Sequence, residues 1–288
     1  MSEKTKGLWI NFILYTVAFA VGLVPFCLID NILIAEAVFT AVATLVIYVV
    51  TCFVPDTSLY DPYWSVAPVV MIAAAMIKYS YYSTNAFVIL IVFVVWSVRL
   101  TGNWAITYKG LLHEDWRYRQ YRESSGKIGF ALINFIGLQF VPTIVVYAGM
   151  IGALHILGSD GFSPMIIPGV IVMLAGVLLE FFSDRAIHRF LSENRGMRKT
   201  CDISIWHYSR HPNYLGEMTF WTGVYLAFLG VRADIWYAGL GFLSIIALFL
   251  FVSIPMMEKH NLSRRDDYEE YRQRTSVLIP LPNRNKED

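Results

Sequence analysis

The sequence has few charged residues for its length. Only 16% of the 288 residues are charged, whereas soluble globular domains average roughly 25%. A disordered chain needs low hydrophobicity and high net charge, but here 56% of the residues are hydrophobic and the formal net charge is +1. The mean hydropathy of +0.51 indicates more apolar surface than one water-soluble core would bury. We therefore expect a polytopic membrane protein, with no charge bias toward nucleic acid.

Several signatures of other protein classes are also missing. The three cysteines show no CxxC or metal spacing, and their odd number argues against a disulfide framework. The scattered histidines give no metal-ligand pattern, so we expect no metal. The G-x-G-x-x-G motif is absent, which excludes a Rossmann nucleotide site. No small-residue cleavage pattern follows the first apolar run, so we interpret it as a retained span.

Long apolar runs are abundant. A helix needs about 20 apolar residues to cross the bilayer core. Eight runs are candidates, namely 8–29, 33–54, 66–82, 86–104, 130–156, 166–187, 215–231 and 236–257. The third ends in a polar segment, and the seventh is short. The sequence therefore predicts an all-α polytopic membrane helix bundle with about seven to eight transmembrane helices, in a single membrane-embedded domain over 1–288.

The basic residues predict the orientation of this bundle. With a cytoplasmic N-terminus, 19 of the 23 Lys and Arg residues fall in cytoplasmic segments, as the positive-inside rule requires. We therefore expect both termini in the cytoplasm. Residues 1–104 are nearly all membrane and are expected to shape a lipid pocket, while the polar loops lie in 105–288. A simpler explanation of the basic loops is that they only set the orientation of the chain in the membrane.

Polar residues gather near the end of the sixth run. Glu180, Asp184 and His188 are four residues apart and so share one helix face. Ionisable residues inside a membrane helix are costly and by default suggest a functional site. Arg185 fits a simpler role, in which its side chain reaches the lipid headgroups.

The segment Trp206–Glu217 gathers further polar side chains where the seventh run begins. Arg210 and His211 can bind phosphate or carboxylate, and a helix that starts at the next residue aims free N–H groups at an anion. Gly216 would let a flat ring approach the backbone. Glu217 needs a partner inside the membrane, such as a carboxamide or a ribose hydroxyl. We interpret the segment as a binding site, because a plain helix start does not need these side chains together.

The run Tyr208-Ser-Arg-His-Pro-Asn-Tyr-Leu-Gly-Glu217, preceded by the Asp184 segment, resembles the steroid 5-alpha-reductase superfamily. It is most similar to the bacterial branch known only as a domain of unknown function. Further local matches occur in the expected order, namely Tyr60–Pro68, Arg99–Asn103, Glu114–Tyr118 and the tail Met257–Pro280. The resemblance covers about residues 55–283. The resemblance implies an integral-membrane enzyme of a bacterial inner membrane, or alternatively of the endoplasmic reticulum.

Members of this superfamily bind NADPH from the cytosolic side and reduce an activated carbon–carbon double bond in a lipid. The resemblance thus implies an NADPH-dependent reductase of a lipid or steroid-like substrate. It places Asp184 near the adenosine, a basic loop at the phosphates, and residues 208–217 around the nicotinamide and its ribose. The implied cofactor residues are Asp184, Arg195, Arg198, Lys199, Tyr208, Arg210, His211, Asn213, Tyr214 and Glu217.

In these enzymes a glutamate and a tyrosine act on the substrate ketone. The glutamate position corresponds to Asp61, but the tyrosine position holds Trp96, so Tyr63 or Tyr108 is the expected replacement. A donor at the carbonyl would stabilise the negative charge that grows there during hydride transfer. Plainer readings are a helix N-cap for Asp61 and an interfacial aromatic belt for Tyr63.

Two other functions compete with the reductase. Isoprenylcysteine carboxyl methyltransferases share Arg-His-Pro-x-Tyr-x-Gly at a helix start and use S-adenosylmethionine. An acidic residue after the glycine, here Glu217, is typical of the reductases, and the basic pair Arg198 and Lys199 suits a trianionic nucleotide. A transporter or scaffold is the non-enzyme alternative, although the sequence shows no repeat between its halves.

Overall fold

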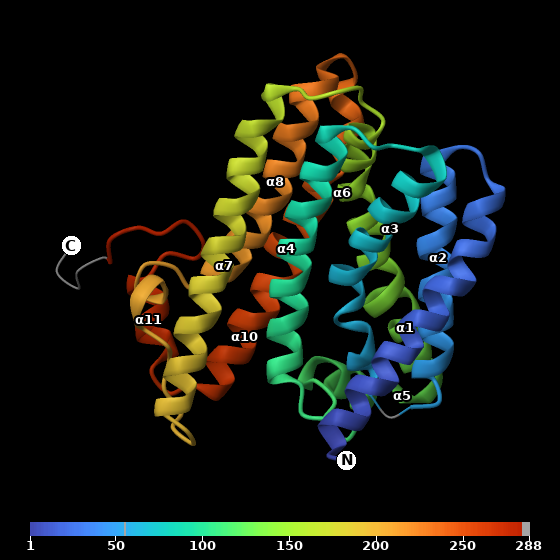
Figure 1. Cartoon of the computed structure of the whole chain (residues 1–288). Coiled ribbons are helices and arrows are strands. Elements are labelled where there is room, and N and C mark those ends of the chain that lie inside the picture. The colour runs from blue at the N-terminus through green and yellow to red at the C-terminus, as the bar shows by residue number, and fades with distance from the viewer. Residues whose placement is uncertain (55, 284–288) are drawn as a thin grey trace. The chain divides into compact units, whose positions relative to one another are not determined.

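The computed structural model describes residues 1–54 and 56–283 of the chain (Figure 1). It is 80% helical and has no strands in the described part, which confirms the all-α prediction. Seven helical segments are long and apolar enough to cross a membrane, by length and composition. They are Glu3–Leu28, Ile32–Phe53, Thr57–Tyr79, Thr84–Thr107, Trp116–Leu157, Pro164–Glu193 and Phe242–Arg264.

The weak seventh run of the sequence folds as helix α8 (Pro212–Arg232). It is 21 residues long, but it is not among the seven segments that are apolar enough to cross a membrane. The structure thus supports the lower end of the predicted number of spans. The cytoplasmic position of both termini stays a prediction. Arg284 and Lys286, which belong to the last basic segment, lie outside the described residues.

The chain divides into two compact units. The first unit comprises Met1–Ser163 with Asp234–Gly241, and the second comprises Pro164–Ala233 with Phe242–Asp288. This boundary does not coincide with residue 104, where the sequence changes from membrane runs to polar loops. Whether the chain acts as one functional domain stays a prediction.

The first unit contains six α-helices and shorter helical turns. They are α1 (Glu3–Leu28), α2 (Ile32–Thr51), η1 (Thr57–Tyr60), α3 (Tyr63–Tyr79), α4 (Thr84–Thr107), α5 (Trp116–Leu132), the π-helical η2 (Ile133–Phe140), α6 (Val141–Leu157) and most of η5 (Ala233–Gly239). Short polar side chains set three of the helix starts, because each accepts a backbone N–H that has no partner within its helix. Ser2 accepts from Thr5, Asn31 from Ile34, and Ser83 from Ala86.

The second unit is built on one long helix pair. Its elements are η3 (Pro164–Ile166), α7 (Ile167–Glu193), η4 (Ser204–His207), α8, α9 (Phe242–Leu248), the π-helical η6 (Phe249–Ser253), α10 (Ile254–Arg264) and α11 (Tyr268–Arg274). Figure 1 shows α7 and α8 side by side in yellow-green and orange. The loop from 194 to 211 joins them, and it carries most of the residues that the sequence marked as a site.

Glycines bring α7 and α8 into close contact. A Cβ on Gly176 would lie 2.6 Å from the carbonyl oxygen of Gly216, and a Cβ on Gly223 would lie 2.7 Å from that of Gly169. Small residues at matched positions let two helix backbones approach closely in a membrane protein. The sequence analysis assigned Gly216 to the approach of a flat ligand ring. The structure corrects this, because a Cβ on Gly216 would meet the Glu180 side chain at 2.4 Å.

Candidate functional site in the second unit

The loop before α8 is held by the C-terminal segment. The Arg210 N–H donates to the Ser276 carbonyl oxygen at 2.9 Å, and the Ser209 hydroxyl donates to the Leu278 carbonyl oxygen at 2.7 Å. The Leu281 N–H donates in turn to the Tyr208 carbonyl oxygen at 3.2 Å. Residues more than 60 positions apart in the chain therefore fix the backbone of the motif.

One carboxylate on α10, that of Glu258, contacts both Arg210 and His211. Oε1 of Glu258 accepts from Nε of Arg210 at 3.0 Å and from the Tyr268 hydroxyl at 2.7 Å, and it lies 2.7 Å from Nε2 of His211. Arg210 is 8% exposed and His211 4% exposed, so these contacts are largely shielded from water. Nη1 of Arg210 also donates to the carbonyl oxygens of Arg272 and Thr275. Arg210 and His211 therefore stabilise the conformation of the loop before α8.

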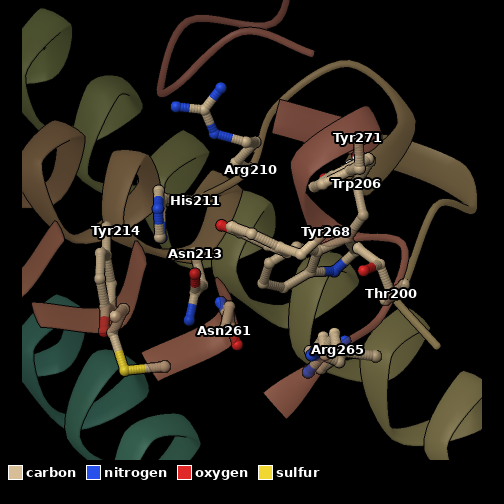
Figure 2. A pocket seen from close by; sticks show the side chains of 13 residues that line it. Thr200, Trp206, Arg210, His211, Asn213, Tyr214, Asn261, Arg265, Tyr268 and Tyr271 are labelled. Carbon is tan, nitrogen blue, oxygen red and sulfur yellow. Dashed lines mark hydrogen bonds between the residues drawn. The ribbon is translucent and has the colours of Figure 1, made fainter. Parts of the chain in front are cut away.

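A pocket of about 130 Å³ opens beside this cluster (Figure 2). Four of the residues that the sequence proposed for a cofactor line it, namely Arg210, His211, Asn213 and Tyr214. The His211 and Tyr214 rings stack with centroids 5.3 Å apart and an angle of 8° between their planes. The other lining residues are Ile187, Thr200, Cys201, Trp206, Met257, Asn261, Arg265, Tyr268 and Tyr271.

Polar side chains at the pocket wall remain available to a ligand. The Asn213 side chain makes no hydrogen bond to any residue that the structure describes, so its amide can both donate and accept. Asn213, Asn261 and Arg265 all line the pocket (Figure 2). One Arg265 N–H donates to the Lys199 carbonyl oxygen at 3.2 Å. The wall therefore combines amides, a guanidinium and a stacked aromatic face.

Thr200 and Cys201 form another part of the pocket wall. The Thr200 N–H and hydroxyl donate to Oδ1 of Asp267 at 2.8 and 2.6 Å. Burial alone would raise the pKa of Asp267, but these two donors bring the pKa of its carboxyl below its ordinary value. Burial raises the pKa of the neighbouring Cys201 thiol to about 11. At neutral pH the Cys201 thiol in the wall is therefore neutral, and the Asp267 carboxylate behind Thr200 is ionised.

The basic loop expected at the phosphates is exposed. Arg195, Arg198 and Lys199 all face solvent. Arg198 pairs with Asp266 at 3.2 Å and donates to the Arg264 carbonyl oxygen. None of the three basic residues lines the pocket. The loop therefore offers positive charge outside the pocket, near the segment that carries Arg265.

Three other proposed cofactor residues lie outside the pocket lining. Asp184 is partly exposed on α7, and Tyr208 is 46% exposed with its ring edge against His207. Glu217 is 4% exposed and accepts from Nε1 of Trp221 at 2.9 Å. Contact of these residues with a cofactor stays a prediction.

The two proposed catalytic residues belong to the first unit. Asp61 accepts a hydrogen bond from the Tyr118 hydroxyl, and Nη2 of Arg117 lies 3.8 Å from its second oxygen. The N-cap of α3 is Pro62, which has no side-chain cap bond, so the capping role considered for Asp61 is wrong. Asp61 is instead tied to the start of α5.

Tyr63 lies in the interior of the first unit. It is 1% exposed, and its hydroxyl donates to the Thr40 carbonyl oxygen at 3.1 Å. Its ring packs between those of Tyr60 and Phe19, with centroids 5.3 and 5.8 Å away. The interfacial aromatic belt considered for Tyr63 is therefore wrong, because this side chain does not reach the surface.

Sequence reasoning missed the contribution of the C-terminal helices. Met257, Asn261 and Arg265 line the pocket at spacings of four residues, and Tyr268 and Tyr271 follow on α11. Their periodicity was visible, since residues four apart share a helix face. The many charged residues of segment 258–274 are typical of a solvent-facing amphipathic helix, so the sequence gives little signal for an inward face.

Comparison with known proteins gives one match. A family model described as "Protein of unknown function (DUF1295)" matches residues 47–275. The chain belongs to this family. No curated protein and no solved structure matches the chain. The DUF1295 match begins within α2 and ends just after α11, so it includes every residue of the pocket lining and the Asp61–Tyr118 pair.

Proposed function

We propose that this DUF1295 protein is a membrane-bound reductase that takes hydride from NADPH. Its substrate would be a lipid or steroid-like molecule with an activated C=C bond (an enone), and the hydride would add to the β-carbon. One observation carries the proposal, namely a pocket in which the Asn213 amide has no hydrogen-bond partner among the described residues and the His211 and Tyr214 rings are stacked. The resemblance of residues 208–217 to the steroid 5-alpha-reductase superfamily supports NADPH as the ligand, and its bacterial branch supports a bacterial inner membrane.

The residues of the pocket fit part of such a cofactor. A carboxamide needs both a donor and an acceptor, and the Asn213 amide supplies both. A flat ring gains from a stacked aromatic face such as Tyr214. Sites that enclose a whole ligand measure roughly 300–1,000 Å³, so a cavity of about 130 Å³ suits one ring. Phosphates would then extend out of it past Arg265 of the lining, toward the donors of the exposed Arg195 and Lys199.

The resemblance assigns the proton chemistry to Asp61 together with a tyrosine. When bound, NADPH supplies the hydride. Negative charge then grows on the substrate carbonyl oxygen, and a donor placed there would lower the barrier. Tyr118 donates to Asp61, whereas the Tyr63 hydroxyl is committed to the Thr40 carbonyl oxygen. We therefore propose Tyr118 as the tyrosine that acts with Asp61, in place of the family tyrosine whose position holds Trp96.

The test is thermal stabilisation of the detergent-purified protein by NADPH, NADH and S-adenosylmethionine in parallel. A ligand that binds only the folded state adds about 2.7 kcal/mol at a hundredfold excess over its dissociation constant. We expect a shift with NADPH that is lost in Asn213→Ala and kept in Gln273→Ala, a control on the exposed face of α11. A shift with S-adenosylmethionine alone would make the protein a methyltransferase instead.

Glu217 needs its own measurement, because its contact with Trp221 competes with a role in binding. Glu217→Ala is expected to weaken NADPH binding if the carboxylate reaches a carboxamide or a ribose hydroxyl. Unchanged affinity in a variant that melts at a lower temperature would assign Glu217 to contacts within the protein, such as the one with Trp221.

A further inference from the structure

Two segments of the second unit are joined along one side of the pocket. They are the loop 198–200 and the turn 264–267, and we call the contact between them the clasp. Thr200 and Arg265, one from each segment, line the pocket. Thr200 is buried, whereas the side chains of Arg198 and Asp266 are exposed. The clasp therefore lies between this side of the pocket and the solvent.

Exposed contacts hold the outer side of the clasp. Nη2 of Arg198 lies 3.2 Å from Oδ1 of Asp266, and Nε of Arg198 donates to the Arg264 carbonyl oxygen at 3.1 Å. The Asp266 N–H donates to the Arg198 carbonyl oxygen at 3.1 Å. An ion pair between exposed side chains contributes little to stability, because water and salt screen it. The outer side of the clasp can therefore separate at low cost.

The inner side of the clasp depends on Asp267. Its Oδ1 accepts from the Thr200 N–H at 2.8 Å and from the Thr200 hydroxyl at 2.6 Å, and its Oδ2 lies 3.1 Å from the same N–H. Nη1 of Arg265 donates to the Lys199 carbonyl oxygen at 3.2 Å. Hydrogen bonds to a charged acceptor are roughly twice as strong as neutral ones. Asp267 therefore contributes most to the attachment of the loop.

A second set of donors lies within reach of the Asp267 carboxylate. Asp267 is the N-cap residue of α11, and Asp is preferred at that position because its carboxylate accepts free N–H groups of the first helical turn. The Asp267 side chain makes no such cap bond here, since it is bound to Thr200 instead. When it releases Thr200, the carboxylate can accept from α11. Opening of the clasp thus exchanges one set of hydrogen bonds for another.

The size of the pocket favours a wall that moves. Sites that enclose a whole ligand measure roughly 300–1,000 Å³, whereas this cavity measures about 130 Å³. A ligand larger than one ring therefore needs part of the wall to give way. The clasp is suited to this movement, because its outer contacts are exposed and its inner carboxylate has two alternative sets of donors.

We propose that the clasp controls entry to the pocket: it opens when Asp267 releases Thr200 and caps α11, and it closes over a bound ligand. That this ligand is NADPH rests on the proposed function, whereas opening is a property of the protein alone. Cys201 follows Thr200 in the chain, is buried, and lines the pocket. Opening of the clasp therefore exposes a thiol that the closed structure covers.

The rate at which iodoacetamide alkylates Cys201, measured without nucleotide, tests the proposal. The detergent-purified protein carries Cys27→Ser and Cys52→Ser, because both of these thiols are exposed, and all rates are compared at one pH. The rate of modification of a covered group follows the population of the open state when opening is fast. Wild-type protein is therefore expected to react slowly, and variants that weaken the clasp are expected to react faster.

Two variants weaken the clasp to different degrees. Asp267→Ala removes every hydrogen bond that Thr200 makes to the carboxylate and should raise the rate about tenfold or more, because these bonds go to a charged group. Arg198→Ala removes only exposed contacts and should raise it about two- to fivefold. Arg189→Ala, the control, breaks a similarly exposed pair with Glu193 on α7 and should leave the rate unchanged.

Two further observations separate opening from other causes of faster alkylation. The charged groups that act on the Cys201 thiol are Arg265 and Asp202, and no variant changes them. Val224→Cys, in a protein whose native cysteines are serine, reports unfolding, because Val224 is buried on α8. Asp267→Ala should leave the rate at that position unchanged.

An unchanged Cys201 rate in a folded Asp267→Ala protein would overturn the proposal. If Asp267→Ala raises the rate equally at both positions, the protein unfolds, and Arg198→Ala then decides: no faster alkylation of Cys201 in that variant overturns the clasp as well. NADPH at a hundredfold excess over its dissociation constant should slow alkylation roughly a hundredfold. Faster alkylation in the variants without protection by NADPH would refute NADPH as the ligand and leave the clasp in place.

Discussion

Nε of Arg210 donates to Oε1 of Glu258 over 3.0 Å and joins the loop before α8 to helix α10. Nη1 of Arg210 donates to the backbone carbonyl oxygens of Arg272 and Thr275. Because Nε and Nη1 already donate to protein groups, the guanidinium cannot also bind a phosphate through two parallel N–H donors. The motif arginine therefore builds the wall of the pocket, and the exposed cations Arg195, Lys199 and the lining Arg265 are better placed to meet an anion.

The first prediction concerns Glu258, whose side chain is 14% exposed. Glu258→Ala leaves Arg210, His211 and Tyr268 without their shared acceptor. Removing one partner of a largely buried ion pair costs about 3–5 kcal/mol, and we expect a loss of this size in the free energy of unfolding in detergent. Glu269→Gln breaks an exposed pair with Arg272 and should cost less than about 1 kcal/mol. Equal losses in the two variants would contradict the central role of Glu258.

The second prediction concerns the glycines between α7 and α8. A Cβ on Gly216 would lie 2.8 Å from the Gly176 carbonyl oxygen, and backbone cannot move aside as a side chain can. Gly216→Ala should therefore destabilise the protein by about 1–3 kcal/mol, the usual cost of overpacking. Gly102→Ala on α4 is the control, because nothing lies within 4 Å of its added Cβ. That variant should be neutral or slightly more stable, since Ala favours helix over Gly.

The membrane fold could be predicted because the length of an apolar run is enough to indicate a helix that spans a membrane. Seven of the eight apolar runs overlap helical segments that can span a membrane, while the run at 215–231 became α8, a helix whose residues mostly face protein. The site was predictable only where residues adjacent in sequence stay adjacent in space, as His211, Asn213 and Tyr214 do. Glu258 and Asn261 join it through a contact between distant segments, which no local pattern encodes.

The third prediction concerns the pH dependence of thiol labelling. Burial raises the pKa of Cys201 to about 11, and only the thiolate reacts with maleimide or iodoacetamide. An ordinary thiol has a pKa of about 8.5, so Cys201 should react roughly 300-fold more slowly at pH 7.5. Its rate should rise about tenfold per pH unit up to pH 10. The measurement uses a protein in which Cys27 and Cys52, both exposed, are replaced by serine. Fast labelling at pH 7.5 that equals the rate in urea would show that the thiol is not buried in solution.

The fourth prediction separates the candidate proton donors. Tyr118→Phe removes only the hydroxyl that donates to Asp61, and Asp61→Asn removes the acid itself. If this pair acts on the substrate carbonyl, each variant should lower turnover of an enone by about 10²–10³-fold, the usual loss when one such donor is removed. The thermal shift with NADPH should persist, because Asn213 and the other pocket residues are unchanged.

Tyr121→Phe is the matched control for this prediction, since Tyr121 lies on the same helix and its hydroxyl makes no hydrogen bond to the described residues. Tyr63→Phe tests Tyr63 as the alternative proton donor. The buried Tyr63 hydroxyl that this change removes donates to the Thr40 carbonyl oxygen. A loss of turnover in Tyr63→Phe with none in Tyr118→Phe would assign the proton donor to Tyr63. A lower melting temperature in Asp61→Asn without a fall in turnover per folded molecule would instead mean that Asp61 holds α5 in place through Arg117 and Tyr118.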